Sequence, residues 1–398
     1  MTIKKEQKPQ RPQKERIETR LIHGGIDGDP RTGAVSVPIY QTSTYRQKAF
    51  GQSPEYEYSR TGNPTREALE KLIAELEGGT HGFAFASGMA ALTAVLLLFQ
   101  SGEKIVISNN VYGGTFRILD KVLKQFGLSY EIVDTTDLDL LEKAFADKAA
   151  AVLLESPANP LLTVTDIAGV AALAKARGVL TIVDNTFMTP YLQRPLGLGA
   201  DIVVHSATKY LGGHSDLVAG LAVVNSAELA ERLHFIQNAT GGILEPFDSW
   251  LLIRGIKTLG VRMDRHLENA RYLAEFLRGQ PGIKKVFYPG FPDSSGYAIQ
   301  QKQASGPGAI ISFLLSEEYE LSRFFENLDL IIFGESLGGV ESLICHPASM
   351  THAAIPAEIR RQVGIEDNLV RLSVGLENKE DLTDDLTKAL TAARKNRR

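Results

Sequence analysis

Residues 201–213 read DIVVHSATKYLGG, an apolar run followed at once by hydroxyls, a lysine and two glycines. The run at 202–204 is apolar throughout instead of alternating with polar residues, which is typical of a strand covered on both faces by helices. Side-chain donors and backbone-permissive glycines directly after such a strand indicate that something is held at its carboxyl end.

The same pattern repeats along the middle of the chain. Short apolar runs occur at 104–108, 130–134, 151–156, 180–185, 201–206 and 220–224. Helix-compatible segments such as 166–178 separate them, and this alternation predicts a doubly wound, mostly parallel α/β sheet. A helix is expected to begin at Pro64, with Asn63 as its cap, and to end at Gly78.

Beyond residue 255 the pattern changes to long amphipathic helices mixed with alternating strands at 309–315 and 369–377. These features predict a second, smaller α+β domain at the C-terminus. The expected divisions are an N-terminal arm and extended segment at 1–63, a larger domain at 64–255 and a C-terminal α+β domain at 256–398. Residues 1 to about 18 are too polar to pack alone, so we expect a mobile arm there.

Composition excludes several classes of function. A chain of 398 residues with 43% hydrophobic content can bury two cores, and a net charge of -4 gives no basic surface for nucleic acid. Cys345 is the only cysteine, so no internal disulfide is possible. No apolar run is long enough to span a membrane, and the first residues lack the apolar stretch of a signal peptide. We therefore expect a cytoplasmic protein that binds neither membranes nor nucleic acid.

Polar residues follow several of the predicted strands, where ligands bind in open α/β sheets. Ser87, Gly88 and Met89 open a predicted helix whose free amides would hold a phosphate. Ser206 and Thr208 would supply further donors to that phosphate. Taken singly, these residues are more simply explained as a helix cap and turn hydroxyls.

Asp184 and Lys209 add two further chemical groups. A lone carboxylate at a strand end is commonly a turn residue, and a lone lysine is commonly solvated. In combination, Asp184 would keep a pyridine nitrogen protonated, and a desolvated Lys209 amine would attack an aldehyde. With a phosphate seat, these are the groups that pyridoxal phosphate requires. The sequence contains no GxGxxG after a strand, no GxxxxGK[ST] and no HExxH, and its histidines show no metal-site spacing.

With these residues assembled, the chain resembles the Cys/Met-metabolism family of pyridoxal-phosphate enzymes. The motifs that carry the resemblance are YSRTGNPT (58–65), SGMAA (87–91), VYGGT (111–115), ESPANP (155–160), VDNTF (183–187), HSATKYLGGHSD (205–216), ESLGGVESL (335–343) and RLSVGLE (371–377). They span nearly the whole chain in a fixed order. The resemblance implies fold type I, the aspartate-aminotransferase-like fold, with the cofactor bound by the 64–255 domain.

The resemblance also implies a role for each matched position. Lys209 would bind the cofactor aldehyde and then move protons between substrate carbons, Tyr112 would stack on the ring and assist proton or leaving-group transfer, and Asp184 would pair with the ring nitrogen. The implied phosphate ligands are Gly88, Met89, Ser206 and Thr208, together with Tyr58 and Arg60 from a neighbouring subunit. The implied substrate ligands are Asn159, Glu335, Ser336, Arg371 and Arg117. The implied assembly is a homotetramer of two dimers with sites shared between subunits.

Glu335 matches the acidic residue of family members that use cystathionine, where it would pair with the distal ammonium of the substrate. Methionine γ-lyases tend to have an aliphatic residue there, and a cysteine at the place of Gly114. The resemblance therefore implies the cystathionine γ-lyase reaction, an α,γ-elimination that gives cysteine, 2-oxobutanoate and ammonia. Side activity on homocysteine or cysteine, with release of hydrogen sulfide, is also expected.

Alternatives remain open from sequence alone. The same cofactor would serve a cystathionine γ-synthase or O-acetylhomoserine sulfhydrylase, which adds a thiol to an activated homoserine, or a cystathionine β-lyase, which cuts on the other side of sulfur. A binding protein without catalysis is also compatible with the fold, because a fold does not determine a function.

Overall fold

The computed structural model describes residues 15–395, except 27, 30, 53, 147, 352 and 354–356. The first fourteen residues of the expected mobile arm therefore lie outside the described residues. The rest of the 1–63 segment was expected to be extended. The structure differs from this expectation, because helix α1 (Ile17–His23) forms there. Leu21 of α1 is buried in the main hydrophobic core and Ile17 packs against it, contacts that were not evident from a polar segment.

Seven strands form the larger sheet, in the order β1-β7-β6-β5-β4-β2-β3. Their bounds are β1 (His81–Phe85), β2 (Lys104–Ser108), β3 (Ser129–Val133), β4 (Ala149–Glu155), β5 (Leu180–Asp184), β6 (Ile202–Ser206) and β7 (Gly220–Val224). Neighbouring strands are parallel except for β7, which is antiparallel to both β1 and β6. All six predicted strands form, so the predicted mostly parallel sheet is confirmed.

Within the larger sheet, the strand that sequence reasoning missed is β1, whose sequence HGFAF is short and interrupted by Gly82. A glycine inside a strand weakens the strand pattern, but here it has a packing reason. A Cβ atom at Gly82 would lie 2.2 Å from the carbonyl oxygen of Glu70 on the covering helix. Glycine therefore lets that helix pack closely on the sheet.

Helices cover both faces of the larger sheet. One face carries α3 (Gly88–Leu96), α4 (Gly113–Lys121) and α8 (Ala227–Thr240), and the other carries α2 (Pro64–Glu77), α5 (Leu138–Ala146) and α6 (Ile167–Ala176). The connecting elements are η1 (Leu123–Phe126), α7 (Thr189–Leu192), η2 (Pro195–Leu198) and α9 (Pro246–Ile256). Successive residues of β2 alternate between the two cores, Ile105 on one side and Val106 on the other. This explains why the strand sequences are apolar at every position.

Helix α2 begins and ends where the sequence predicted. The Asn63 side chain accepts hydrogen bonds from the backbone amides of Thr65 at 3.0 Å and Arg66 at 3.4 Å. At the other end, Gly78 adopts a left-handed conformation with φ of +73°, which ends the helix.

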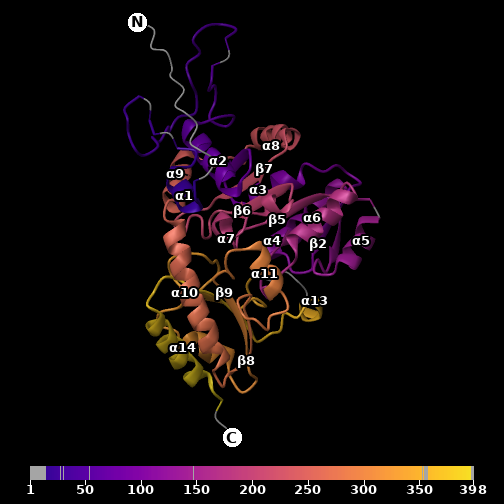
Figure 1. The fold of residues 1–398 in the computed structure, drawn as a ribbon, viewed down its shortest axis with the longest axis vertical. Coiled ribbons are helices and arrows are strands. Elements are labelled where there is room, and N and C mark those ends of the chain that lie inside the picture. The colour runs from indigo at the N-terminus through magenta and orange to yellow at the C-terminus, as the bar shows by residue number, and fades with distance from the viewer. Residues whose placement is uncertain are drawn as a thin grey trace.

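A second sheet of five strands forms in the C-terminal part, in the order β10-β11-β12-β9-β8. Its strands are β8 (Ile283–Phe287), β9 (Ile310–Leu315), β10 (Ile332–Phe333), β11 (Leu343–Cys345) and β12 (Leu369–Ser373). The helices of this part are α10 (Leu259–Arg278), α11 (Tyr297–Gln303), α12 (Leu321–Glu326), α13 (Ala357–Gln362) and α14 (Lys379–Ala393). Figure 1 shows α10 and α14 running along one side of the second sheet, while the indigo N-terminal segment reaches away from the body at the opposite end of the molecule.

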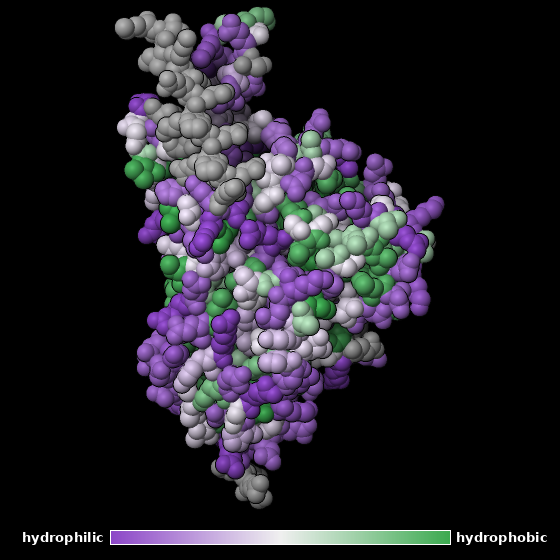
Figure 2. Space-filling view, in the orientation of Figure 1, coloured by the Kyte–Doolittle hydropathy of each residue, from purple (hydrophilic) through white to green (hydrophobic). Residues whose placement is uncertain are grey.

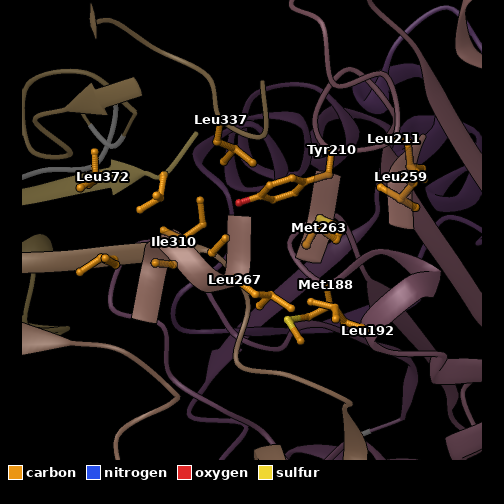
Figure 3. Close-up of a cluster of buried hydrophobic side chains, with 14 of the residues drawn as sticks. Met188, Leu192, Tyr210, Leu211, Leu259, Met263, Leu267, Ile310, Leu337 and Leu372 are labelled. Carbon is orange, nitrogen blue, oxygen red and sulfur yellow. The ribbon is translucent and has the colours of Figure 1, made fainter. Parts of the chain in front are cut away.

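One hydrophobic core connects the two sheets. Figure 3 shows Tyr210, which directly follows Lys209 in the chain, with Met263 of α10 and with Ile310 and Leu337 of the C-terminal part. The Tyr210 ring is fully buried and meets the His266 ring edge to face at a centroid distance of 5.3 Å. Residues of the second sheet are therefore held in a fixed relation to the segment that carries Lys209.

The visible surface is mixed in character. Hydrophilic and hydrophobic residues are interspersed on the face in Figure 2 and form no broad apolar band there. Among the described residues, no helix is both long enough and apolar enough to cross a membrane.

Candidate active site

A cavity of about 270 Å³ opens where the carboxyl ends of β4, β5 and β6 meet the start of α3 and the second sheet. The residues that line it are Ser87, Gly88, Met89, Leu92, Tyr112, Thr115, Glu155, Pro157, Asn159, Asp184, Thr186, Phe187, Ser206, Thr208, Lys209, Val218, Glu335, Ser336, Leu337, Thr351 and Arg371. Eleven of the fourteen predicted site residues are among them. The cavity is therefore assembled from both parts of the chain.

Lys209 projects into the cavity three residues beyond the end of β6. Its Nζ donates a hydrogen bond of 2.7 Å to Ser336 Oγ. Burial is the main cause that lowers the pKa of Lys209 to about 8, the Arg371 charge adds to the shift, and Glu335 opposes it. A substantial fraction of this amine is therefore neutral, and nucleophilic, near physiological pH.

Arg371 lies on β12 and is only 2% exposed, although its alternating sequence context would suit an exposed strand position. Its guanidinium donates from Nη1 to Asn159 Oδ1 at 2.9 Å and from Nη2 to the carbonyl oxygen of Ser336 at 3.0 Å. Its buried Nε has no hydrogen-bond partner among the described residues. Such a donor at a cavity wall favours binding of a small anion.

Ser336 has a strained backbone conformation, with φ of +99°. A non-glycine residue in this region is uncommon and persists only where its surroundings hold it. Here Arg371 binds the Ser336 carbonyl and Lys209 binds its hydroxyl. In this conformation the hydroxyl of Ser336 contacts Lys209 and its carbonyl oxygen contacts Arg371.

Two carboxyl groups, Glu155 and Asp184, line the cavity from adjacent strands in register. Burial and the neighbouring Asp184 raise the pKa of Glu155 to about 8. Burial also raises the pKa of Asp184, but the hydroxyl and amide of Thr186 both donate to Asp184 Oδ1 and oppose that shift. Two close carboxylates resist ionising together, and the two Thr186 donors favour the ionised form of Asp184 over that of Glu155.

The amino end of α3 forms another wall of the cavity. Ser87 caps this helix by accepting a hydrogen bond of 3.0 Å from the Ala90 amide. The amides of Gly88 and Met89 lie in the first turn, where no intrahelical acceptor exists. A Cβ atom at Gly88 would lie 2.8 Å from Ser206 Cβ, so only glycine allows the two segments to approach this closely. This narrow, amide-lined corner suits a phosphate.

Tyr112 stands at the start of α4 with 40% of its surface exposed. Its backbone amide donates to Glu155 Oε1 at 2.6 Å, which holds the backbone from which the ring projects. A Cβ atom at Gly114 would lie 2.4 Å from Tyr112 Cε1. Glycine at that position is therefore necessary for the observed orientation of the ring.

Three predicted site residues lie outside this cavity. Tyr58 and Arg60 are exposed in the N-terminal segment, with the Arg60 guanidinium 5.3 Å from the centre of the Tyr58 ring. Arg117 is exposed on α4 and does not line the cavity, so the structure does not bring it to the other predicted substrate ligands.

Sequence reasoning missed Glu155 and Thr186. Both follow the rule that located Asp184, because Glu155 is the last residue of β4 and Thr186 follows β5 by two residues. The described residues contain no group of three or more His, Cys, Asp or Glu side chains that could hold a metal ion.

Comparison with known proteins then decides the family. Residues 18–391 match the family model of the Cys/Met metabolism PLP-dependent enzymes. The chain belongs to this family. Among family members, it is 58% identical over 374 residues to cystathionine beta-lyase of Lactococcus lactis subsp. cremoris (strain MG1363), covering 94% of this chain and 98% of the relative. It is 56% identical over 373 residues to cystathionine gamma-lyase of Bacillus subtilis (strain 168), again covering 94% of this chain and 98% of the relative.

A solved structure of the family agrees with the observed fold. Cystathionine gamma-lyase from Lactobacillus plantarum, complexed with L-serine, superposes with a TM-score of 0.94 and 53% identity over 95% of this chain and 99% of the other. The predicted fold type I architecture is thereby confirmed, and the cofactor of the family is pyridoxal 5'-phosphate. The comparisons place the chain among the pyridoxal-phosphate-dependent enzymes of trans-sulfuration, a family that includes carbon–sulfur lyases.

The cavity suits that cofactor. The close approach of Gly88 to Ser206 leaves an amide-lined corner for a phosphate, and Asp184 supplies a carboxylate for a ring nitrogen. The amine of Lys209, with its lowered pKa, is suited to reaction with an aldehyde.

Proposed function

We propose that the protein is a cystathionine γ-lyase, which converts L-cystathionine and water to L-cysteine, 2-oxobutanoate and ammonia. The observation that carries this proposal is the combination of Arg371 and Glu335 in one cavity with Lys209. Arg371 suits the α-carboxylate of an amino acid, and Glu335 suits a distal ammonium. Cystathionine is a thioether with an amino acid group at each end, so it supplies both partners.

The chain's own residues supply the proton transfers. Bound pyridoxal phosphate supplies the electron sink for the pair left at the substrate Cα. Lys209, neutral in part because of its lowered pKa, would accept the Cα proton, return that proton to the conjugated system of the bound cofactor and substrate, and, once neutral again, accept a Cβ proton. Tyr112 protonates the departing sulfur, and Arg371 with Asn159 holds the carboxylate throughout.

Methionine is disfavoured as the main substrate. Glu335 would place an unpaired carboxylate beside the apolar end of methionine, which costs free energy when water is excluded. In addition, Gly114 leaves room for the Tyr112 ring in its observed orientation, whereas a larger residue at position 114 would displace the ring. We expect slower side reactions with homocysteine and cysteine, which release hydrogen sulfide.

The second candidate is β-elimination, as in a cystathionine β-lyase. It is favoured by the 58% identity to the Lactococcus relative of that name. Synthase chemistry has weaker support, since a Bacillus subtilis relative named cystathionine gamma-synthase/O-acetylhomoserine (thiol)-lyase is 48% identical.

Product identification tests the proposal. The purified protein, loaded with pyridoxal phosphate, is incubated with L-cystathionine and the products are identified by mass spectrometry. Cysteine with 2-oxobutanoate supports the γ-lyase, whereas homocysteine with pyruvate supports the β-lyase. Formation of a thioether only from activated homoserine plus a thiol supports the synthase, and no turnover of any of these supports a binding protein.

We also propose a homotetramer built from two dimers, with sites shared between subunits. The support is that Tyr58 and Arg60 do not line the cavity of their own chain and are exposed. In a dimer they would reach the phosphate of the neighbouring site, as the family resemblance implies. Light scattering on the purified protein measures the assembly directly.

A further inference from the structure

Arg66 is a buried arginine with no part in the steps above. It is the third residue of α2 and only 2% exposed. A cation in the first turn of a helix meets the positive end of the helix dipole, and burial adds a desolvation cost. Its contacts must therefore compensate for an unfavourable position.

Those contacts are mainly to the backbone of one loop, which contains residues 58–60. Arg66 Nη1 donates to the carbonyl oxygen of Ser59 at 2.7 Å, and Nη2 donates to the carbonyl oxygen of Arg60 at 3.1 Å. Its Nε lies 3.5 Å from Glu70 Oε1, one turn further along α2. The planar guanidinium thus holds two successive peptide groups, a geometry that a lysine ammonium does not reproduce.

The same loop presents Tyr58 and Arg60. Its backbone is held from inside by Arg66, and Asn63 adds a hydrogen bond of 3.1 Å to Ser59 Oγ. On the outside, Tyr58 is 45% exposed, and Arg60 Nε donates to Asn238 Oδ1 at 3.2 Å. The loop is therefore rigid in its backbone while its two functional side chains face outward.

We propose that Arg66 is a positioning residue that fixes Tyr58 and Arg60 for contact with the cofactor phosphate in the neighbouring subunit. The inference rests on the proposed sharing of sites between subunits. Arg66 does not line the cavity, and the hydrogen bonds of its guanidinium go to the backbone carbonyls of residues 59 and 60.

The first test compares two forms of the cofactor. Arg66→Lys keeps the charge and loses the two-pronged contact, so the apoprotein variant should bind pyridoxal 5'-phosphate at least about tenfold more weakly. Its affinity for pyridoxal, which has no phosphate, should not change. Arg265→Lys, at an exposed arginine of α10, is the matched control and should change neither affinity. Equal weakening of both ligands, or of neither, would overturn the proposal.

The second test assigns the effect to a subunit. Differently tagged Arg66→Lys and Lys209→Ala chains are co-expressed, and hybrids are purified through both tags and assayed at a pyridoxal 5'-phosphate concentration that leaves most sites of the Arg66→Lys parent empty. In a hybrid, the chain with an intact lysine receives its loop from the chain with an intact Arg66, so activity should exceed that of either parent several-fold. Absence of this gain would show that Arg66 acts within its own subunit, against the proposal.

A parallel hybrid separates the inference from its premise. Arg60→Ala replaces Arg66→Lys, and again Lys209→Ala is the second chain. A gain in this pair but none in the Arg66 pair contradicts only the role of Arg66, whereas no gain in either contradicts the sharing of sites. If Arg66→Lys is insoluble, Arg66→Gln retains a side-chain amide donor and is tested in the same two assays.

Discussion

At the scale of single residues, the charged groups of the cavity shift one another's pKa values. The low pKa of Lys209 has burial as its first cause and Arg371 as its second, and Glu335 acts in the opposite direction. The same three side chains would bind the cofactor aldehyde and the two ends of a dipolar substrate. Substrate recognition and nucleophile activation are therefore linked through charge.

This linkage predicts a pH dependence for cofactor binding. Because the neutral amine is the reactive form, the rate at which apoprotein binds pyridoxal phosphate should rise with pH and level off above about 8. Glu335→Gln removes the charge that raises the pKa of Lys209, so the midpoint should move to lower pH. Stopped-flow absorbance across a pH series measures both midpoints. A midpoint that stays in place or moves upward in Glu335→Gln would contradict the assigned effect of the Glu335 charge on the pKa of Lys209.

Lys209→Ala should reduce turnover of cystathionine by about a thousandfold or more, because it removes the group that moves the protons. The measurement is 2-oxobutanoate release by variant and parent at equal cofactor loading. A variant with unchanged turnover would refute the catalytic assignment as a whole.

A backbone contact can be tested at Gly88. An added methyl would lie 2.8 Å from Ser206 Cβ, and relief of such overlap costs about 1–3 kcal/mol. Gly88→Ala should therefore weaken pyridoxal phosphate binding by about tenfold or more, as measured by titration of the apoprotein. Gly197→Ala, where nothing lies within 4 Å of the added atom, serves as the control.

The residues that sequence reasoning found, and those it missed, differ in the kind of signal they leave. Asp184 and Lys209 follow apolar strands, where chain position alone indicates a ligand site. Arg371 could not be placed by pattern, because its burial depends on β12 being an inner strand of the second sheet. Glu155 was missed although its position at a strand end is equivalent to that of Asp184.

At the scale of elements, boundaries were predictable where local chemistry fixes them. Asn63 and Pro64 start α2, and Gly78 ends it, because capping and backbone conformation act within a few residues. By contrast, α1 forms through burial of Leu21 in a core made by distant segments. Local pattern carries no information about such tertiary contacts.

The Asn63 side chain caps α2 and also binds the N-terminal segment. Its Nδ2 also donates to the carbonyl oxygen of Tyr40 at 2.9 Å, which ties the N-terminal segment to α2. Asn63→Ala should lower the free energy of unfolding by about 1–3 kcal/mol, more than a cap alone contributes. Asn378→Ala, which removes only the cap of α14, should cost about 1 kcal/mol. Urea unfolding of the two variants measures the difference, and equal losses would contradict the tie.

At the scale of the whole molecule, the continuous core beneath Tyr210 joins the two sheets. Unfolding of one part would expose apolar surface of the other, so we expect a single cooperative transition. The only tryptophan, Trp250, lies on α9, donates from its indole nitrogen to Ser36 Oγ, and reports on the N-terminal segment and the larger part rather than on the second sheet. In the apoprotein at fixed concentration, the urea midpoint from its fluorescence should equal that from far-UV circular dichroism. Two separate midpoints would show that the parts unfold independently.

The division of the cavity between the two sheets also bears on how the enzyme's substrate range could change. Asp184 ends strand β5 of the larger sheet and Lys209 closely follows β6, whereas Glu335, Ser336 and Arg371 come from the C-terminal part. Sequence change in the loop around Glu335 can therefore alter which thioether is accepted while leaving the bond-breaking machinery intact. Relatives with different preferences are expected to be interconverted by exchanging this loop, with no change to the segments that carry Asp184 and Lys209.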